Sequence, residues 1–215
     1  MPIVIILALI SAWFSDAFTT LILICSSFVF YAFWEPIYVL ILAGSVAVNF
    51  FIARYIQTNG HAYKFQWLIV GVTLNLGLLV YFKYTIFLSQ NLARFLGQPI
   101  VNNAWFTSLA LPLGISFFTF QQVAFLVDSY KRKILKISAL KYVFYVTFFP
   151  QLVAGPIVRY LELEGQISQP FKHRVKFPLI AVGVFFFVVG ICKKTLIADP
   201  LGFYFTDPVF AAAER

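Results

Sequence analysis

The chain has 215 residues, of which 61% are hydrophobic and 11% charged, and its mean hydropathy of +0.89 excludes a soluble domain with a solvated surface. Its net charge of +8 does not indicate nucleic-acid binding, because the basic residues flank apolar runs and form no continuous patch. We therefore expect an all-α polytopic integral membrane protein. Its helical bundle would lie in the lipid bilayer and form one continuous unit over residues 1–215.

The first apolar run, PIVIILALISAWF from Pro2, is short for a membrane span at about 1.5 Å per residue. No Lys or Arg precedes it, so we expect a short membrane-embedded helix and not the core of a signal peptide. Longer runs predict helices across the membrane, with one broken segment at 142–158. These runs lie at 17–34, 37–57, 65–89, 109–130 and 177–192.

The positions of the basic residues predict the orientation. The connection 131–141 holds five Lys or Arg residues and is the strongest cytoplasmic marker in the chain. Counting spans backwards puts the connection 58–64 inside and the connection 90–108 outside. The latter is predicted to lie along the outer surface.

Neither the cysteines nor the histidines are spaced like metal ligands or a catalytic triad, so no metal is expected. Cys25 and Cys192 lie far apart in apolar runs, and His61 and His173 lie in charged loops. No residue of this sequence is predicted to be catalytic.

Aromatic residues make up 20% of the chain, and many fall near the ends of predicted spans. Such rings gather where hydrocarbon meets water, so an interfacial belt is favoured over an aromatic ligand box. The belt would comprise Phe30, Tyr31, Phe33, Trp34, Tyr38, Trp67, Tyr81, Tyr84 and Trp105. Lys83 is expected to extend its ammonium group to the same boundary.

Polar residues interrupt the apolar run 109–130. Helical residues seven apart lie on one face, which places Gly114, Gln121 and Asp128 on one line, flanked by Ala124 and Phe117. Lipid cannot satisfy the hydrogen bonds of such a stripe, so we expect an interior helix that faces protein or a water-filled cavity.

Two interpretations of this stripe stay open. In the structural one, the two glutamines hold neighbouring helices together, and Asp128 pairs with Lys131 or Arg132 at the cytoplasmic boundary. In the functional one, the stripe lines a path for a substrate.

The segment 142–158, YVFYVTFFPQLVAGPIV, cannot form one continuous helix because Pro150, Gly155 and Pro156 interrupt it. Both of its flanks are basic, so we expect a re-entrant element that returns to the cytoplasmic face. Broken backbone at membrane depth must be buried in protein or line a cavity. Together with the polar stripe, the break favours a membrane-embedded polar cavity.

The candidate residues follow from this cavity. Arg159 can hold a phosphate or carboxylate with two N–H groups, or it anchors the chain at the cytoplasmic surface. The predicted path residues are Gln121, Gln122, Gln151 and Arg159, and the predicted structural or gating residues are Asp128, Gly114, Pro150, Gly155 and Pro156.

Three blocks of the sequence resemble the membrane-bound O-acyltransferases, most closely their alginate O-acetyltransferase branch. They are LPLGISFFTFQQVAFLVDSYKRK, FFPQLVAGPIVRY and KKTLIADPL, and SSFVFYAFWEP from Ser26 is similar to an early helix of that branch. The resemblance implies a ring of membrane helices around a funnel in a bacterial inner membrane. Within it, an acyl group from a cytoplasmic donor reaches an acceptor across the bilayer.

The donor implied by the resemblance is acetyl-CoA or a carrier derived from it, used as a substrate with no bound cofactor. The implied acceptor is an exported polysaccharide such as alginate, or a partner protein that passes the acetyl group on. In this family the catalytic base is a histidine on a later helix, which has no counterpart here, and neither His61 nor His173 matches its motif. We therefore expect an N-terminal portion of a longer protein, close to inactive alone.

Two other functions stay open: a transporter or channel that uses the broken helix for translocation, and a non-catalytic scaffold that recruits an enzyme.

The last apolar run also has two interpretations. Lys193 and Lys194 end it on the side opposite the basic loops, contrary to the positive-inside trend. Either 177–192 is not a simple crossing, or the two lysines face a polar funnel or an anionic polymer.

Overall fold

The structure is a computed structural model, and the residues it describes are 2–33, 35–58, 63–96, 111–134, 138–152, 155, 158–168 and 177–213. Every regular element in these ranges is a helix, which confirms the all-α membrane fold expected from the sequence. The chain divides into two compact units, Met1–Gln169 and Pro170–Arg215, and each is described by itself. That the whole chain forms one membrane unit stays a prediction.

The first unit begins with the short helix predicted from the sequence, α1 (Pro2–Ser11). It packs on α2 (Asp16–Ala32), where the buried Ser11 hydroxyl donates to Thr19 Oγ1 at 3.1 Å. Helix α2 starts at residue 16 because Ser15 accepts a hydrogen bond from the Phe18 N–H at 3.1 Å and so caps the helix. These local hydrogen bonds fix the entry of the chain into the first long helix.

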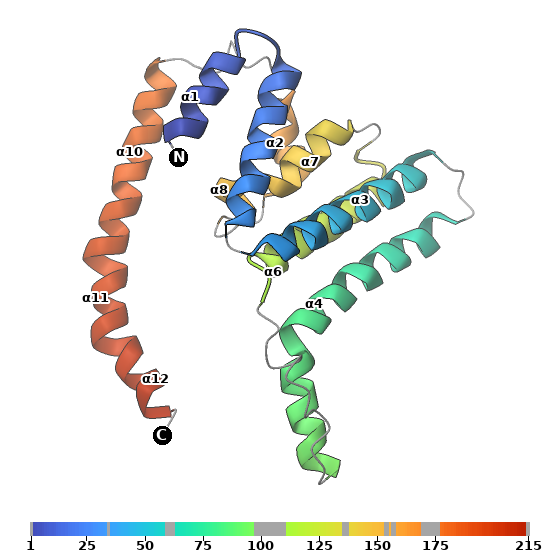
Figure 1. Ribbon diagram of the computed structural model, residues 1–215, viewed down its shortest axis with the longest axis vertical. Helices are drawn as coiled ribbons and strands as arrows, with labels where there is room; N and C mark the ends of the chain where they lie inside the picture. The colour runs from blue at the N-terminus through green and yellow to red at the C-terminus, as the bar shows by residue number, and fades with distance from the viewer. Residues whose placement is uncertain are drawn as a thin grey trace. The chain divides into compact units, whose positions relative to one another are not determined.

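Two predicted spans are confirmed in the next two helices. Helix α3 (Pro36–Thr58) and the 64–91 part of α4 (Lys64–Leu96) are long and apolar enough to cross a membrane. Helix α4 changes direction part-way along its length (Figure 1). It continues beyond the predicted end at 89 into the connection expected on the outer surface. The rest of that connection lies outside the described residues.

Helix α6 (Ile115–Tyr130) packs against α3, α4 and α7 within the first unit (Figure 1). Its buried residues confirm the predicted interior helix, because they occur on several sides of it. They are Ile115, Phe118, Thr119, Gln121, Gln122, Phe125, Leu126, Asp128 and Ser129.

Gly114 is not part of this helix, so its prediction as one end of a helical stripe is wrong. It lies directly before α6 in the left-handed conformation, with φ of 69°. A Cβ atom there would overlap the backbone carbonyl oxygen of Leu152. Glycine is therefore required twice, for its backbone angle and for the close approach of the broken segment.

The broken segment consists of three helices: α7 (Ala139–Thr147), the single turn α8 (Phe149–Leu152) and α9 (Tyr160–Ile167). Phe148, with φ of −56° and ψ of 105°, ends α7. This confirms the predicted break. The physical reason is Pro150, which has no N–H to continue the helix and whose ring would meet the carbonyl four residues back. Gly155 belongs to no helix, and Pro156 lies outside the described residues.

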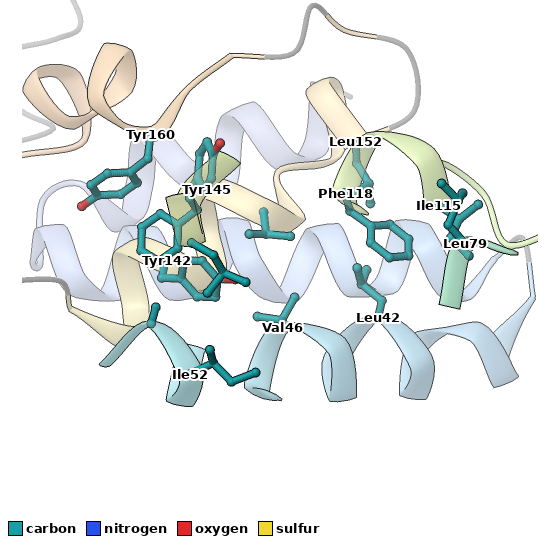
Figure 2. Packing of buried hydrophobic residues seen from close by; sticks show 14 of the residues in the cluster. Leu42, Val46, Ile52, Leu79, Ile115, Phe118, Tyr142, Tyr145, Leu152 and Tyr160 are labelled. Carbon is teal, nitrogen blue, oxygen red and sulfur yellow. The ribbon is translucent and has the colours of Figure 1, made fainter. Parts of the chain in front are cut away.

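Aromatic rings join α6 to the broken segment. The Phe125 ring centroid lies 4.6 Å from that of Tyr142 and 5.5 Å from that of Tyr160. Tyr145 and Tyr160 meet edge to face, with centroids 5.5 Å apart. Figure 2 shows the three tyrosines gathered at one end of the core and Phe118 further along it. This packing holds α7 and α9 against the interior helix.

The predicted aromatic belt is wrong for two of its members. Tyr31 and Tyr38 are buried in the core, with exposed fractions of 1% and 7%. An aromatic residue near a helix end fits either a core or a boundary, and here neighbouring helices cover both rings. The exposed members are Phe30, Phe33, Trp67, Tyr81 and Tyr84, while Trp34 and Trp105 lie outside the described residues.

The second unit is one helical path: α10 (Phe177–Lys193), α11 (Asp199–Leu201) and α12 (Asp207–Ala213), joined by π-helical turns at Lys194–Ala198 and Gly202–Thr206. Lys194 forms an ion pair with Asp199, with Nζ 2.9 Å from Oδ2. Because the helix runs on through both lysines, the predicted run 177–192 is not a simple crossing that ends there.

A second close-packed glycine lies between the long helices. A Cβ on Gly71 of α4 would lie 2.5 Å from Leu126 Cδ1 and 3.3 Å from Ile52 Cγ2. Leu126 belongs to α6 and Ile52 to α3, and both are buried. Small residues at such crossings allow membrane helices to approach closely.

Gly71→Leu is therefore expected to lower the free energy of unfolding by about 1–3 kcal/mol, because the added side chain forces the three helices apart. The matched control is Gly77→Leu, since a Cβ on Gly77 of the same helix meets nothing within 4 Å. Thermal unfolding of the detergent-solubilised complete protein measures both variants. Equal losses in the two would contradict the packing assigned to Gly71.

Gly114→Ala is expected to destabilise the protein for two reasons. An alanine in the left-handed conformation costs about 1–2 kcal/mol. The Leu152 carbonyl must also move to make room for the added methyl group, which increases the loss of stability beyond this value. Gly165→Ala in α9 is the control, because its added methyl group enters open space. Limited proteolysis and the melting temperature of the solubilised protein report the difference. A Gly114→Ala variant as stable as the control would disprove the contact with α8.

Candidate functional site

Three buried amide side chains hydrogen-bond to one another between the long helices. Asn75 Nδ2 of α4 donates to Asn49 Oδ1 of α3 at 2.6 Å, and Asn49 Nδ2 donates to Gln122 Oε1 of α6. Ser45 Oγ also donates to Gln122 Oε1, at 3.1 Å. We call Asn49, Asn75 and Gln122 the amide cluster; their exposed fractions are 3%, 2% and 0%. The cluster fastens three helices together where no water competes.

Side-chain hydroxyl groups supply hydrogen-bond partners for backbone groups of the broken segment. The Phe149 N–H donates to Ser27 Oγ at 3.2 Å, and this oxygen donates in turn to the Leu23 carbonyl at 2.8 Å. The Tyr145 hydroxyl donates to the Val158 carbonyl at 2.9 Å, on the other side of the break. Helix α2 thus supplies a partner for the start of α8, and α7 supplies one for the chain that leads into α9.

Several buried polar atoms have no hydrogen-bond partner among the described residues. They are Thr119 Oγ1, Gln121 Oε1, Gln122 Nε2, Tyr142 Oη and Gln151 Nε2. An unsatisfied buried polar group costs about 1–3 kcal/mol, and such groups are rare in native proteins unless water or a ligand meets them. Uncharged amides and hydroxyls bind neutral partners such as carbonyls and sugar hydroxyls, as donor, acceptor or both.

The structure separates the three predicted glutamines by their contacts. Gln122 has interhelical hydrogen bonds, as the structural interpretation of the stripe requires. Gln121 is 2% exposed, with its amide oxygen unpartnered among the described residues. Gln151 is half-buried within α8 and has an unpartnered Nε2. Gln121 and Gln151 therefore have hydrogen-bonding capacity that their described neighbours do not use.

Asp128 lies at the end of α6 and is 3% exposed. Lys133 Nζ lies 3.9 Å from Asp128 Oδ1, and the Lys133 N–H donates to the Asp128 carbonyl at 3.0 Å. The expected partner of Asp128 was Lys131 or Arg132, and the structure shows an ion pair with Lys133. Asp128 thus closes the turn after α6.

Arg159 is exposed and lies directly before α9. Among the described residues, no hydrogen bond or ion pair joins its guanidinium group to the three glutamines.

The remaining candidate residues lie elsewhere. Pro150 is exposed in α8. His61 and His173 lie outside the described residues, and the described ranges contain no group of three or more potential metal ligands.

The family model of the membrane-bound O-acyltransferases matches residues 9–209. The chain belongs to the membrane-bound O-acyltransferase family. This confirms the resemblance carried by the three sequence blocks.

The curated relatives of this chain carry two different names. The "Peptidoglycan O-acetyltransferase" of Helicobacter pylori is 38% identical over 210 residues, which is 85% of this chain and 39% of the relative. The "Probable alginate O-acetylase AlgI" of Pseudomonas aeruginosa is 34% identical over 194 residues, 86% of this chain and 36% of the relative. The protein of the same name from Azotobacter vinelandii is 32% identical over 193 residues, with 86% and 37% covered.

The chain thus spans about two fifths of the length of the curated relatives it matches. No solved structure matches it.

Sequence reasoning missed two members of the amide cluster, Asn49 and Asn75, as site residues. The available signal was an asparagine inside each of two long apolar runs, where a polar residue needs a protein partner. The sequence does not show which polar residues hydrogen-bond to each other, because Asn49 and Gln122 are 73 positions apart.

Asn49→Leu and Asn75→Leu are each expected to destabilise the protein, with a coupling energy of about 0.6–2 kcal/mol between them, because each leaves the other amide without its partner. A double-mutant cycle on unfolding of the solubilised complete protein measures this energy. Thr73→Val, exposed on the same helix as Asn75, is the control. Strictly additive effects of the two asparagine variants would contradict the cluster.

Proposed function

We propose that this chain is part of a membrane O-acetyltransferase that modifies an exported polysaccharide. The donor would be acetyl-CoA, or a carrier derived from it, on the cytoplasmic side of a bacterial inner membrane. The observation that carries the proposal is the family match over residues 9–209, together with relatives whose names all describe O-acetylation. Those names specify peptidoglycan and alginate, so the shared acceptor class is the hydroxyl group of a polysaccharide.

In the proposed reaction the acceptor oxygen attacks the carbonyl carbon of the donor thioester. The new C–O ester bond forms, the C–S bond breaks, and the thiolate leaves. The hydroxyl proton passes to a general base, and we assign that role to none of the described residues. An acyl-accepting partner protein that relays the acetyl group would take part in two transfers. In the second, the polysaccharide oxygen attacks the acetyl carbonyl carbon, the new C–O bond forms, and the bond between the acetyl group and the partner protein breaks, which regenerates the partner.

We assign Gln121, Gln122 and Gln151 to the path along which donor and acceptor meet. The unpartnered amide atoms of Gln121 and Gln151 support this, because an amide can orient a thioester carbonyl or a sugar hydroxyl without changing its own charge. Gln122 would contribute chiefly by holding the path's walls together through the amide cluster.

Arg159 and Asp128 have different proposed roles. Arg159 is exposed where the broken segment enters α9, which suits an arginine that binds a phosphate or carboxylate of the donor. Asp128, with its Lys133 contact, would hold the end of the interior helix in place.

A transporter without covalent chemistry would also use a broken element at membrane depth. Membership of the acyltransferase family favours group transfer over this alternative and over a non-catalytic scaffold.

Gln121→Ala or Arg159→Ala in the complete protein is expected to lower acetylation of the exported polymer about tenfold, because a substrate group loses one buried or charge-assisted hydrogen bond. Mass spectrometry of the polymer measures the acetyl content, and membrane fractionation tests insertion. Gln166→Ala, exposed in α9, is the control. Unchanged acetylation in the first two variants, with normal insertion, would remove both residues from the path.

A further inference from the structure

A pocket of about 270 Å³ lies where the first turn of α4 meets the end of α6. It is lined by Lys64, Phe65, Tyr130, Lys131 and Arg132, and we call it the basic pocket. Lys64 is the first residue of α4, and Lys131 directly follows α6. The Phe65 and Tyr130 rings lie beside each other, with centroids 6.2 Å apart. The pocket therefore combines three cationic side chains with two aromatic ones.

Two of the three cations in the basic pocket, Lys64 and Lys131, form no ion pair among the described residues. Lys64 is only 8% exposed, and among the described residues no carboxylate lies within ion-pair distance of it or of Lys131. The sequence contains no Asp or Glu in 57–70, and Asp128, which precedes the other side of the pocket, forms its ion pair with Lys133. The positive end of the α4 dipole adds to the potential at Lys64. Lysine side chains this close together repel one another, so an anion in the pocket would be stabilised by both.

The surroundings of the basic pocket indicate which anion it takes. Phe65 and Tyr130 are 59% and 37% exposed, as expected of aromatic rings at the boundary between lipid and water. The connection that follows Tyr130 is the basic cluster predicted to be cytoplasmic. Anionic phospholipids of the cytoplasmic leaflet present their phosphates at this level, where each nearby Lys or Arg contributes to their binding.

A place for an acyl chain lies close by. One turn along α4 from Lys64, Trp67 lines a groove of about 520 Å³ between α3 and α4. The groove walls are mainly apolar, with Phe51, Val70 and Leu74 among them, and Arg54 lies at the groove as a further cation. A phospholipid carries both an anionic head group and an apolar chain, whereas a free phosphate uses only the pocket.

We propose that the basic pocket binds the phosphate of an anionic phospholipid from the cytoplasmic leaflet, through Lys64 and Lys131. The lipid's acyl chain follows the surface of α4 toward the apolar groove. This site is separate from the proposed acyl transfer, because it uses none of the candidate path residues.

The test compares lipids bound to the complete protein in nanodiscs of phosphatidylcholine doped with phosphatidylglycerol, read by native mass spectrometry. The wild-type protein is expected to retain phosphatidylglycerol preferentially. Lys64→Gln and Lys131→Gln should each weaken this binding about fivefold. Lys83→Gln is the matched control, since Lys83 is an exposed lysine of the same helix outside the pocket. It should leave binding unchanged.

Folding is checked independently by Lys64→Arg with Lys131→Arg, which keep the charge and should retain the lipid. Added phosphatidylglycerol should also raise the melting temperature of the wild-type protein more than that of the Gln variants. Equal retention of phosphatidylcholine and phosphatidylglycerol by the wild type would overturn the proposal. So would unchanged binding in the Gln variants. Displacement of the lipid by millimolar coenzyme A would also overturn it and assign the pocket to a soluble phosphate ester.

Discussion

Every backbone N–H and C=O group that is buried away from water must find a partner within the protein, and this constraint governs the structure around the break between α7 and α9. Ser27 of α2 accepts from the first N–H of α8, and Tyr145 donates to a carbonyl beyond the break. With these partners in place, an irregular chain can lie inside the bundle. The packing of α2 on α7 and α8, and of Gly114 under Leu152, brings the required groups within reach.

The break and the interior helix were predictable because their causes are local. Pro150 interrupts a helix wherever it occurs, and two adjacent glutamines in an apolar run need protein around them. The hydrogen-bond partners of the broken segment were not predictable, since Phe149 and Ser27 are 122 positions apart. An apolar helix without a polar face also does not reveal which of its sides packs against other helices. Gly114 was misplaced because seven-residue spacing treats every position as helical. The Leu-Pro-Leu-Gly turn before Ile115 was the signal that opposed it.

The buried amides of α6 divide into two kinds although they are neighbours in sequence. Gln122 has partners on α3 and belongs to the scaffold, whereas the oxygen of Gln121 meets no donor among the described residues. Neither side chain titrates near neutral pH, so a path built from them would present the same hydrogen-bonding groups whatever the proton concentration. For a protein of the acyltransferase family, such groups can position a neutral ester or thioester while acid–base chemistry is carried out elsewhere.

The helical path of the second unit is longer than the hydrocarbon it would cross. Its apolar stretch, Pro178–Ala212, has 35 residues and therefore extends over about 50 Å, against about 30 Å of hydrocarbon. The Lys194–Asp199 pair interrupts this stretch, and its neutralised charges lower the penalty of entering the apolar layer. Hydrophobic mismatch of this size requires the helix to tilt steeply or to leave the bilayer after the ion pair. The tilt of this helix relative to the bilayer normal therefore depends on the thickness of the membrane.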